Sequence, residues 1–376
     1  MGSDFERRKF IKAASAAGLV GVAGCTGGPQ GEEGTGTETS EEDTEGAEGG
    51  ATAEASASVN VGMVYALGGL GDNSFNDSAH RGIENAAEEF DISFDESQPS
   101  SASDFQQFQQ RYARSEDPEY DLVNCIGYAQ HDSLAKTAPD YPDQQFTIVD
   151  SVVDEPNVAS YTFKEEEGSF LVGALAGLMT TRSFSAGEGS TQGDSTNVGF
   201  VGGADAPLIR KFQAGYEAGV KHVTDDVDVI TSFVGSFSDP SGGKEAALSM
   251  YQSGADIVYH AAGATGAGVF QAAQSEGRFA IGVDSDQSIT QPEFADVILA
   301  SMVKRVDSAV YKTTQNVVEG NHQGGSSVSL GLEQDGVACV YGDTLGAEIP
   351  AEVKTEIDAS AKAIIEGEID VPTTPQ

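Results

Sequence analysis

Residues 198–234 read VGFVGGADAPLIRKFQAGYEAGVKHVTDDVDVITSFV, and they decide the fold class. The apolar runs at 198–201 and 227–234 have the length and the β-branched content of buried strands. Between them, residues 208–223 repeat apolar side chains at helical spacing. A strand, a helix and a strand joined by short turns form a parallel pair with a right-handed crossover. The stretch therefore predicts an α/β fold built on parallel sheets.

The same alternation runs on both sides of this stretch. The strands expected before it are 59–67, 121–126, 145–150 and 158–163, and the helices are 78–90, 105–115, 132–138 and 168–179. The strands expected after it are 256–260, 279–283, 297–302, 328–332 and 337–341, and the helices are 244–252, 266–275, 306–318 and 351–365. Residues 180–197 are rich in Ser, Gly and Thr and predict a surface loop. Two runs of alternation predict two parallel sheets, and a length of 376 residues suits two domains.

The chain is strongly acidic, with 60 Asp and Glu against 20 Lys and Arg and a formal net charge of −40. The N-terminal tail does not explain this, because residues 58–376 hold 49 acidic and 16 basic residues, a net charge of −33. Nucleic-acid binding requires clustered Lys and Arg and is not expected. An ordinary acidic protein is one explanation. We favour adaptation to molar salt, where a Debye length of about 3 Å screens the self-repulsion.

The N-terminus has the features of an export signal and an anchor. Arg7 and Arg8 precede an apolar run, residues 11–23, that is too short to span a bilayer. The paired arginines resemble a twin-arginine signal, and the VAGC ending at Cys25 resembles a lipobox. We expect a signal over 1–24, a lipidated Cys25 and an acidic disordered tether over 25–57, the alternative being an ordinary N-terminal helix. No later stretch is apolar enough to cross a membrane.

Polar and aromatic residues follow the predicted strands. In open α/β sheets, ligands bind beyond the carboxyl ends of the strands, so these positions are the candidates for a site between two lobes. They are Asp72, Phe75 and Asn76 after the first strand, and Asp150, Phe237, Gly263, Asp284 and Lys304 after later ones. Two aromatic rings, hydrogen-bonding groups and one cation suit a neutral, flat, hydroxylated ligand. A phosphate would require more Arg or Lys, or a helix N-terminus.

Each candidate also has an ordinary structural explanation. Phe75 and Phe237 could be core residues, Asp72 could cap the helix that begins near Phe75, and Asp284 could be a turn residue. Lys304 could be a surface lysine. We find no metal-ligand spacing and no nucleophile with a matching base, so an enzyme is not expected. Cys125 and Cys339 lie in apolar runs and are expected to be buried free thiols.

Many blocks, in order, resemble the basic membrane protein (BMP) family of lipoproteins, the purine-nucleoside-binding components of ABC importers. The blocks include GDNSFND at 71–77, FKEEEGSFLVGALAGL at 163–178, GSFSDPSGGKEAA at 235–247, IGVDSDQ at 281–287 and SMVKRVDSAVY at 301–311. The resemblance implies a two-lobed type I periplasmic-binding-protein fold with three strands crossing a hinge. It implies an N-terminal lobe of 58–164 plus about 303–330, and a C-terminal lobe of about 165–302 plus 331–366.

The resemblance also implies roles for the candidate residues. Phe75 and Phe237 fall on the phenylalanines that stack on the base, and Asn76 and Asp150 fall on residues that contact it. The ribose-contacting positions fall on Gly263, Asp284 and Lys304. One position departs from the family, because Ala66 stands where an Asp usually contacts the ribose. Asp72, six residues further on, is a further candidate ligand-binding residue.

The function implied is capture and delivery of a solute, without a cofactor. The closed protein, expected to be a monomer, would dock on a membrane permease that works with an intracellular ATPase. One alternative is that the same fold binds a free base, a deoxynucleoside or a sugar, and Ala66 supports this. Another is a sensory lipoprotein. An extracellular enzyme is the remaining alternative.

Overall fold

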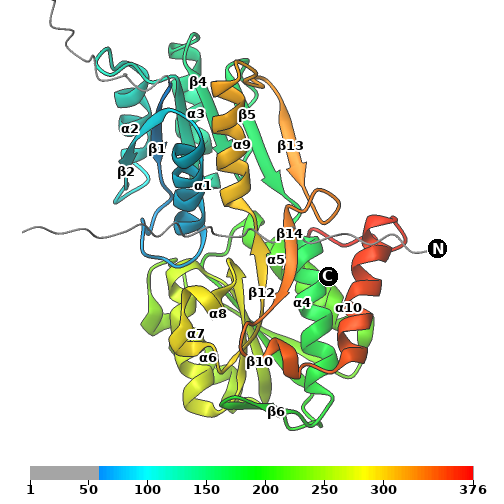
Figure 1. Cartoon of the computed structure of the whole chain (residues 1–376). Helices are drawn as coiled ribbons and strands as arrows, with labels where there is room; N and C mark the ends of the chain where they lie inside the picture. The colour runs from blue at the N-terminus through cyan, green and yellow to red at the C-terminus, as the bar shows by residue number, and fades with distance from the viewer. Residues whose placement is uncertain (1–58, 376) are drawn as a thin grey trace, which may run out of the picture. The chain divides into compact units, whose positions relative to one another are not determined.

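The computed structural model describes residues 59–375. The expected signal over 1–24, the lipidated Cys25 and the tether over 25–57 lie outside the described residues. The described part contains two six-stranded sheets, each with its own helices, and the predicted α/β fold is confirmed (Figure 1).

The first sheet is parallel throughout, in the order β13-β5-β4-β3-β1-β2. Its strands are β1 (Val59–Val64), β2 (Ile92–Ser97), β3 (Leu122–Ile126), β4 (Gln145–Val149), β5 (Val158–Phe163) and β13 (Ser327–Leu330). Helices α1 (Phe75–Glu89) and α9 (Val306–Val318) pack together over one face, and α2 (Asp104–Ala113) and α3 (His131–Thr137) lie over the other (Figure 1).

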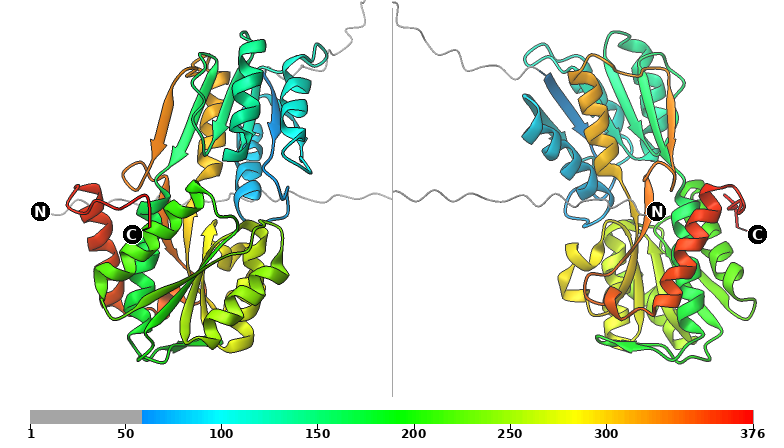
Figure 2. Two further views of the ribbon diagram at one scale, coloured as in Figure 1. Left: turned by 180° about the vertical axis from the view of Figure 1, so that it is seen from behind. Right: turned by 45° about the vertical axis from the view of Figure 1, so that its right-hand side comes forward.

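The second sheet has the order β14-β12-β11-β10-β8-β9, and only β14 is antiparallel to its neighbour. Its strands are β8 (Asn197–Gly202), β9 (Asp228–Phe233), β10 (Ala255–Ala261), β11 (Phe279–Asp284), β12 (Ile298–Lys304) and β14 (Val337–Tyr341). Its helices are α4 (Glu165–Thr180), α5 (Pro207–Val223), α6 (Pro240–Gln252), α7 (Gly266–Glu276), α8 (Gln287–Thr290) and α10 (Ala351–Ile365). Figure 2 shows α10 running alongside α4.

Three connections join the two sheets. The chain passes from β5 into α4, from β12 into α9, and from β13 to β14 (Figure 1). Because the parallel strands of both lobes end toward these connections, their carboxyl ends meet across a single cleft.

Helix α4 is apolar on all sides because it lies between the second sheet and helices α5 and α10. Glycines bring α4 and α5 into backbone contact. A Cβ on Gly215 would lie 2.1 Å from the Glu166 carbonyl oxygen, and one on Gly219 would lie 2.0 Å from that of Phe170. This close approach explains why α5 carries Gly215 and Gly219 on the face that contacts α4.

The structure differs from the predicted elements in several places: α6 begins at Pro240, four residues earlier than predicted, and α8 was not predicted. Strand β2 was not predicted, because it lies at the edge of the sheet and its residues are largely exposed and partly charged, so it lacks the apolar run that marks the other strands. Residues 180–197 hold a short hairpin, β6 (Ser185–Ala186) and β7 (Gly189–Ser190), where a plain loop was expected. Helices α1 and α4 begin three residues earlier than predicted, at Phe75 and Glu165.

Both cysteines among the described residues are free thiols, as predicted. Cys125 is buried, and burial raises the pKa of its thiol. Cys339 is only partly buried, which corrects the expectation that both would be enclosed.

Candidate functional site

A cavity of about 130 Å³ lies between the two lobes at the carboxyl ends of the strands. All eight candidate residues line it: Asp72, Phe75, Asn76, Asp150, Phe237, Gly263, Asp284 and Lys304. Ala66 lines it as well. The strands bring these residues together from distant parts of the chain, as expected for an open α/β sheet.

The loop before α1 is organised by Asp72. Its carboxylate accepts backbone N–H groups of Ser74, Asn76 and Asp77 at 2.9–3.1 Å, so Asp72 caps the helix. Burial raises the pKa of Asp72 to about 6, although these hydrogen bonds act to lower it. Both carboxylate oxygens of Asp72 are therefore engaged in the hydrogen bonds that cap the helix.

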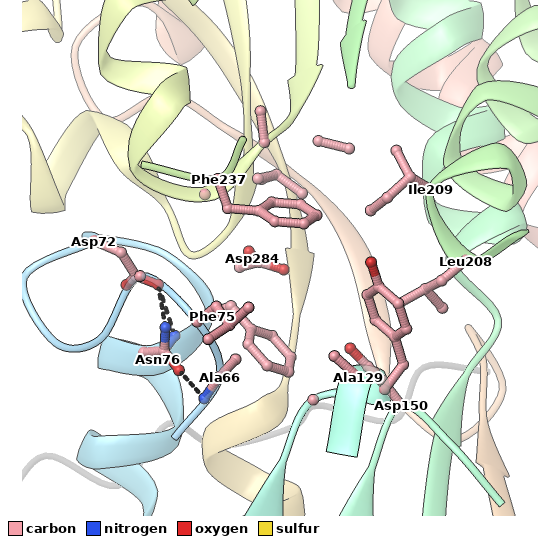
Figure 3. A pocket seen from close by; sticks show the side chains of 18 of the residues that line it. Ala66, Asp72, Phe75, Asn76, Ala129, Asp150, Leu208, Ile209, Phe237 and Asp284 are labelled. Atoms are coloured by element: carbon pink, nitrogen blue, oxygen red, sulfur yellow. Dashed lines mark hydrogen bonds between the residues drawn. The ribbon is translucent and has the colours of Figure 1, made fainter. Parts of the chain in front are cut away.

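Asn76 lies on the first turn of α1 and faces the loop (Figure 3). Its Oδ1 accepts the Ala66 backbone N–H at 2.9 Å, and its Nδ2 donates to Asp72 at 3.1 Å. One N–H of the Asn76 amide thus remains for a ligand.

Asp150 directly follows β4 of the first sheet, and Asp284 ends β11 of the second. Both have a left-handed backbone conformation, with φ values of 67° and 64°. Asp tolerates this conformation better than most residues. Asp284 accepts a hydrogen bond from Ser74 Oγ through Oδ2 at 2.5 Å, which joins the two lobes. Burial raises the pKa of Asp284, although Lys304 opposes the shift.

Lys304 ends β12 and is almost completely buried, not on the surface. Its Nζ donates to Asp150 Oδ2 at 2.7 Å and lies 3.7 Å from Glu165 Oε1. Burial disfavours the ammonium, but Asp150 and Glu165 outweigh burial and raise the pKa of Lys304. The pair leaves Asp150 Oδ1 buried without a partner among the described residues.

Phe75 and Phe237 face the same space from opposite lobes (Figure 3). The Lys304 ammonium lies 4.6 Å from the centre of the Phe75 ring, which is within cation–π range. Glycine makes room for the second ring, since a Cβ on Gly203 would lie 2.4 Å from Phe237 Cδ1. The two rings form opposite walls of a slot for a flat group.

The lobes are closed onto each other beside the cavity. The Asn73 carbonyl oxygen accepts hydrogen bonds from Gln287 Nε2 at 3.1 Å and Thr290 Oγ1 at 3.3 Å. Arg81 donates to Ser285 Oγ at 2.7 Å. These contacts join the loop before α1 and α1 itself to the region of α8.

Sequence reasoning missed several residues at this site. Leu208, Ile209 and Phe212 of α5 line the cavity, and Tyr128 lines it directly after β3. Tyr128 follows a strand and could have been found by the rule that located Asp150. The α5 residues could not, since their spacing is that of any core-facing helix.

A family model described as ABC transporter substrate-binding protein PnrA-like matches residues 59–374. The chain belongs to the Bmp family. Bmp proteins are solute-binding components of ABC transporters, which bind a small molecule and work with a permease and an ATPase. Among residues 59–375, no helix is long and apolar enough to cross a membrane.

Relatives cover most of this Bmp chain. The CD4+ T-cell-stimulating antigen of Listeria monocytogenes is 34% identical over 86% of this chain and 90% of its own length. The ABC transporter nucleoside-binding protein BmpA of Lactococcus lactis is 31% identical over 86% and 92%. A solved ABC transporter solute-binding protein from Aeropyrum pernix superposes with a TM-score of 0.74 at 30% identity, covering 85% of this chain and 94% of that one.

Proposed function

We propose that this Bmp protein captures a nucleoside, with a purine base, in the cavity between its lobes and delivers it to an ABC permease. The observation that carries the proposal is the slot between Phe75 and Phe237, with carboxylates at Asp150 and Asp284. Stacking between two aromatic rings favours a flat base, at about 1–3 kcal/mol per base. The nucleoside-binding name of the Lactococcus relative supports the same class of ligand.

The free polar atoms select a ligand rich in hydrogen-bond donors. Among the described residues, Asp150 Oδ1 has no hydrogen-bond partner, and Asp284 uses only Oδ2 in its bond with Ser74. Ring N–H groups and ribose hydroxyls would donate to these oxygens. A phosphate group would meet carboxylates there, and the one cation in the cavity wall, Lys304, is already paired, so nucleotides are disfavoured.

Ala66 keeps an alternative open. Its methyl group offers no acceptor, where the family's usual Asp would bind a ribose hydroxyl. The same cavity would then take a deoxynucleoside, a free base or a sugar. A sensory lipoprotein would use the same cavity with a different membrane partner.

The cellular setting extends this proposal. A lipid on Cys25 and an acidic tether over 25–57 would hold the protein, as a monomer, at the outer face of the membrane after export by the twin-arginine route. We assign 58–164 plus about 303–330 to the N-terminal lobe, and about 165–302 plus 331–366 to the C-terminal lobe. Closure of the lobes would then present the loaded form to the permease.

Calorimetric titration in molar KCl tests the proposal with inosine, guanosine, adenosine, cytidine, deoxyguanosine, guanine and ribose. We expect the purine ribosides to bind most tightly, and Phe237→Ala to weaken them by about 10- to 100-fold, from the loss of one stacking face. Phe108→Ala, on α2 away from the cavity, is the control. Binding of the deoxynucleoside, free base or ribose alone would favour the alternative, and no binding by folded protein would reject both.

A further inference from the structure

Tyr128 occupies a rigidly held turn at the cavity wall. It begins the short 3-10 turn Tyr128–Gln130 directly after β3, and Gly127 before it has a φ of 105°. The buried Gln130 amide clamps this turn, since its Nε2 donates to the carbonyl oxygens of Val64 at 2.7 Å and Ile126 at 2.9 Å. A turn tied to two neighbouring strands holds its tyrosine in one place.

The Tyr128 hydroxyl is free to meet a ligand. The side chain is half-buried and lines the cavity, and its hydroxyl has no hydrogen-bond partner among residues 59–375. A hydroxyl that lines a cavity without a hydrogen-bond partner in the described residues can bond to a bound molecule.

Asp150 lines the same cavity as Tyr128. Burial and then the negative charge of Asp150 raise the pKa of Tyr128, so its proton stays in place and can be donated. Asp150 in turn offers only an acceptor, Oδ1, because Oδ2 is held by Lys304. One acceptor and one donor thus line the same cavity.

We propose that Tyr128 is a further specificity-determining residue, whose hydroxyl donates to the polar edge of the bound base beside Asp150. This inference rests on the proposed function and names the chemistry of the base. In a 6-oxopurine, the ring N1–H donates to Asp150 while O6 accepts from Tyr128. In a 6-aminopurine, the amino group donates to Asp150 and N1 accepts from Tyr128. The pair therefore selects a base edge with a donor beside an acceptor.

Titrating Tyr128→Phe with two ligands separates this role from packing. Inosine has the polar edge, whereas benzimidazole riboside keeps the ribose and a flat bicyclic ring but has only C–H groups there. We expect Tyr128→Phe to weaken inosine by about tenfold, the size of one lost hydrogen bond, and benzimidazole riboside by less than about twofold. Tyr141→Phe, at the opposite end of the first lobe's strands, should change neither.

Each other outcome has a definite meaning. Equal losses for both ligands would show that the tyrosine acts through packing and would overturn the inference. Unchanged binding of inosine by Tyr128→Phe, with normal binding by the unaltered protein, would overturn the inference alone. An unaltered protein that binds no purine nucleoside would overturn the proposed function, and this inference with it.

Discussion

At the scale of residues, the hinge holds a buried cluster of charges. Glu165, the first residue of α4, is fully buried, and its Oε2 accepts from Lys211 Nζ at 2.7 Å. Lys304 shares its charge between Glu165 at the hinge and Asp150 in the cavity wall. A buried charge without a partner is costly, so the cluster ties the position of Lys304 to the hinge connections.

Glu165 should make stability depend on pH. Burial raises its pKa from the ordinary 4.5 to about 7, against the opposing effect of Lys304 and Lys211. Between these pH values the folded state holds a proton that the unfolded state has released, so the free energy of unfolding falls as pH rises. We expect this group to lower the free energy of unfolding progressively as pH rises from 4.5 to 7.

Urea unfolding of Glu165→Gln at constant salt measures this contribution. The variant stays neutral, so its stability should improve relative to the unaltered protein as pH rises from 4.5 to 7. Glu293→Gln, at an exposed position, is the matched control. Parallel pH profiles for Glu165→Gln and the unaltered protein would contradict the prediction.

At the scale of elements, α4 and α5 pack with their backbones in direct contact. This contact depends on glycines whose missing side chains let the backbones touch. The same pair positions the cavity, because α4 begins with Glu165 and α5 carries Leu208, Ile209 and Phe212. The spacing of the apolar residues predicted both helices, but not that they would lie against each other.

Gly219→Ala tests this contact. Alanine favours a helix over glycine by about 1 kcal/mol, but its Cβ would lie 2.0 Å from the Phe170 carbonyl oxygen. We expect the clash to prevail and the free energy of unfolding to fall by about 1–3 kcal/mol in denaturant titrations. Ser249→Ala, on the exposed face of α6, should stay within about 0.5 kcal/mol. A stabilised Gly219→Ala would show that the helices separate at little cost.

At the scale of the whole molecule, two properties act on the closed arrangement. Interlobe hydrogen bonds favour closure: Ser74 and Arg81 donate across the cleft, and the Asn73 carbonyl oxygen accepts. The net charge of −40 opposes any compact state unless it is screened. The balance between these effects depends on ionic strength.

Circular dichroism across a KCl series tests this balance. We expect a folded spectrum at about 2 M and loss of helical signal below about 0.1 M, where the Debye length reaches roughly 10 Å. NaCl at equal ionic strength should give the same curve, because screening depends on ionic strength alone. A spectrum that stays folded across the series would contradict adaptation to molar salt.

The sequence alone determined the alternation of strands and helices, the existence of two mostly parallel sheets and the polar residues that follow the strands, but not that β14 would be antiparallel. These depend on local periodicity and on the rule that parallel strands end at one edge. Only the tertiary structure decided the long-range partners: that Lys304 is buried between Asp150 and Glu165, and that the Tyr128 hydroxyl has no hydrogen-bond partner among residues 59–375. Such partners come from distant parts of the chain, and no local pattern records which atoms the fold leaves unpaired.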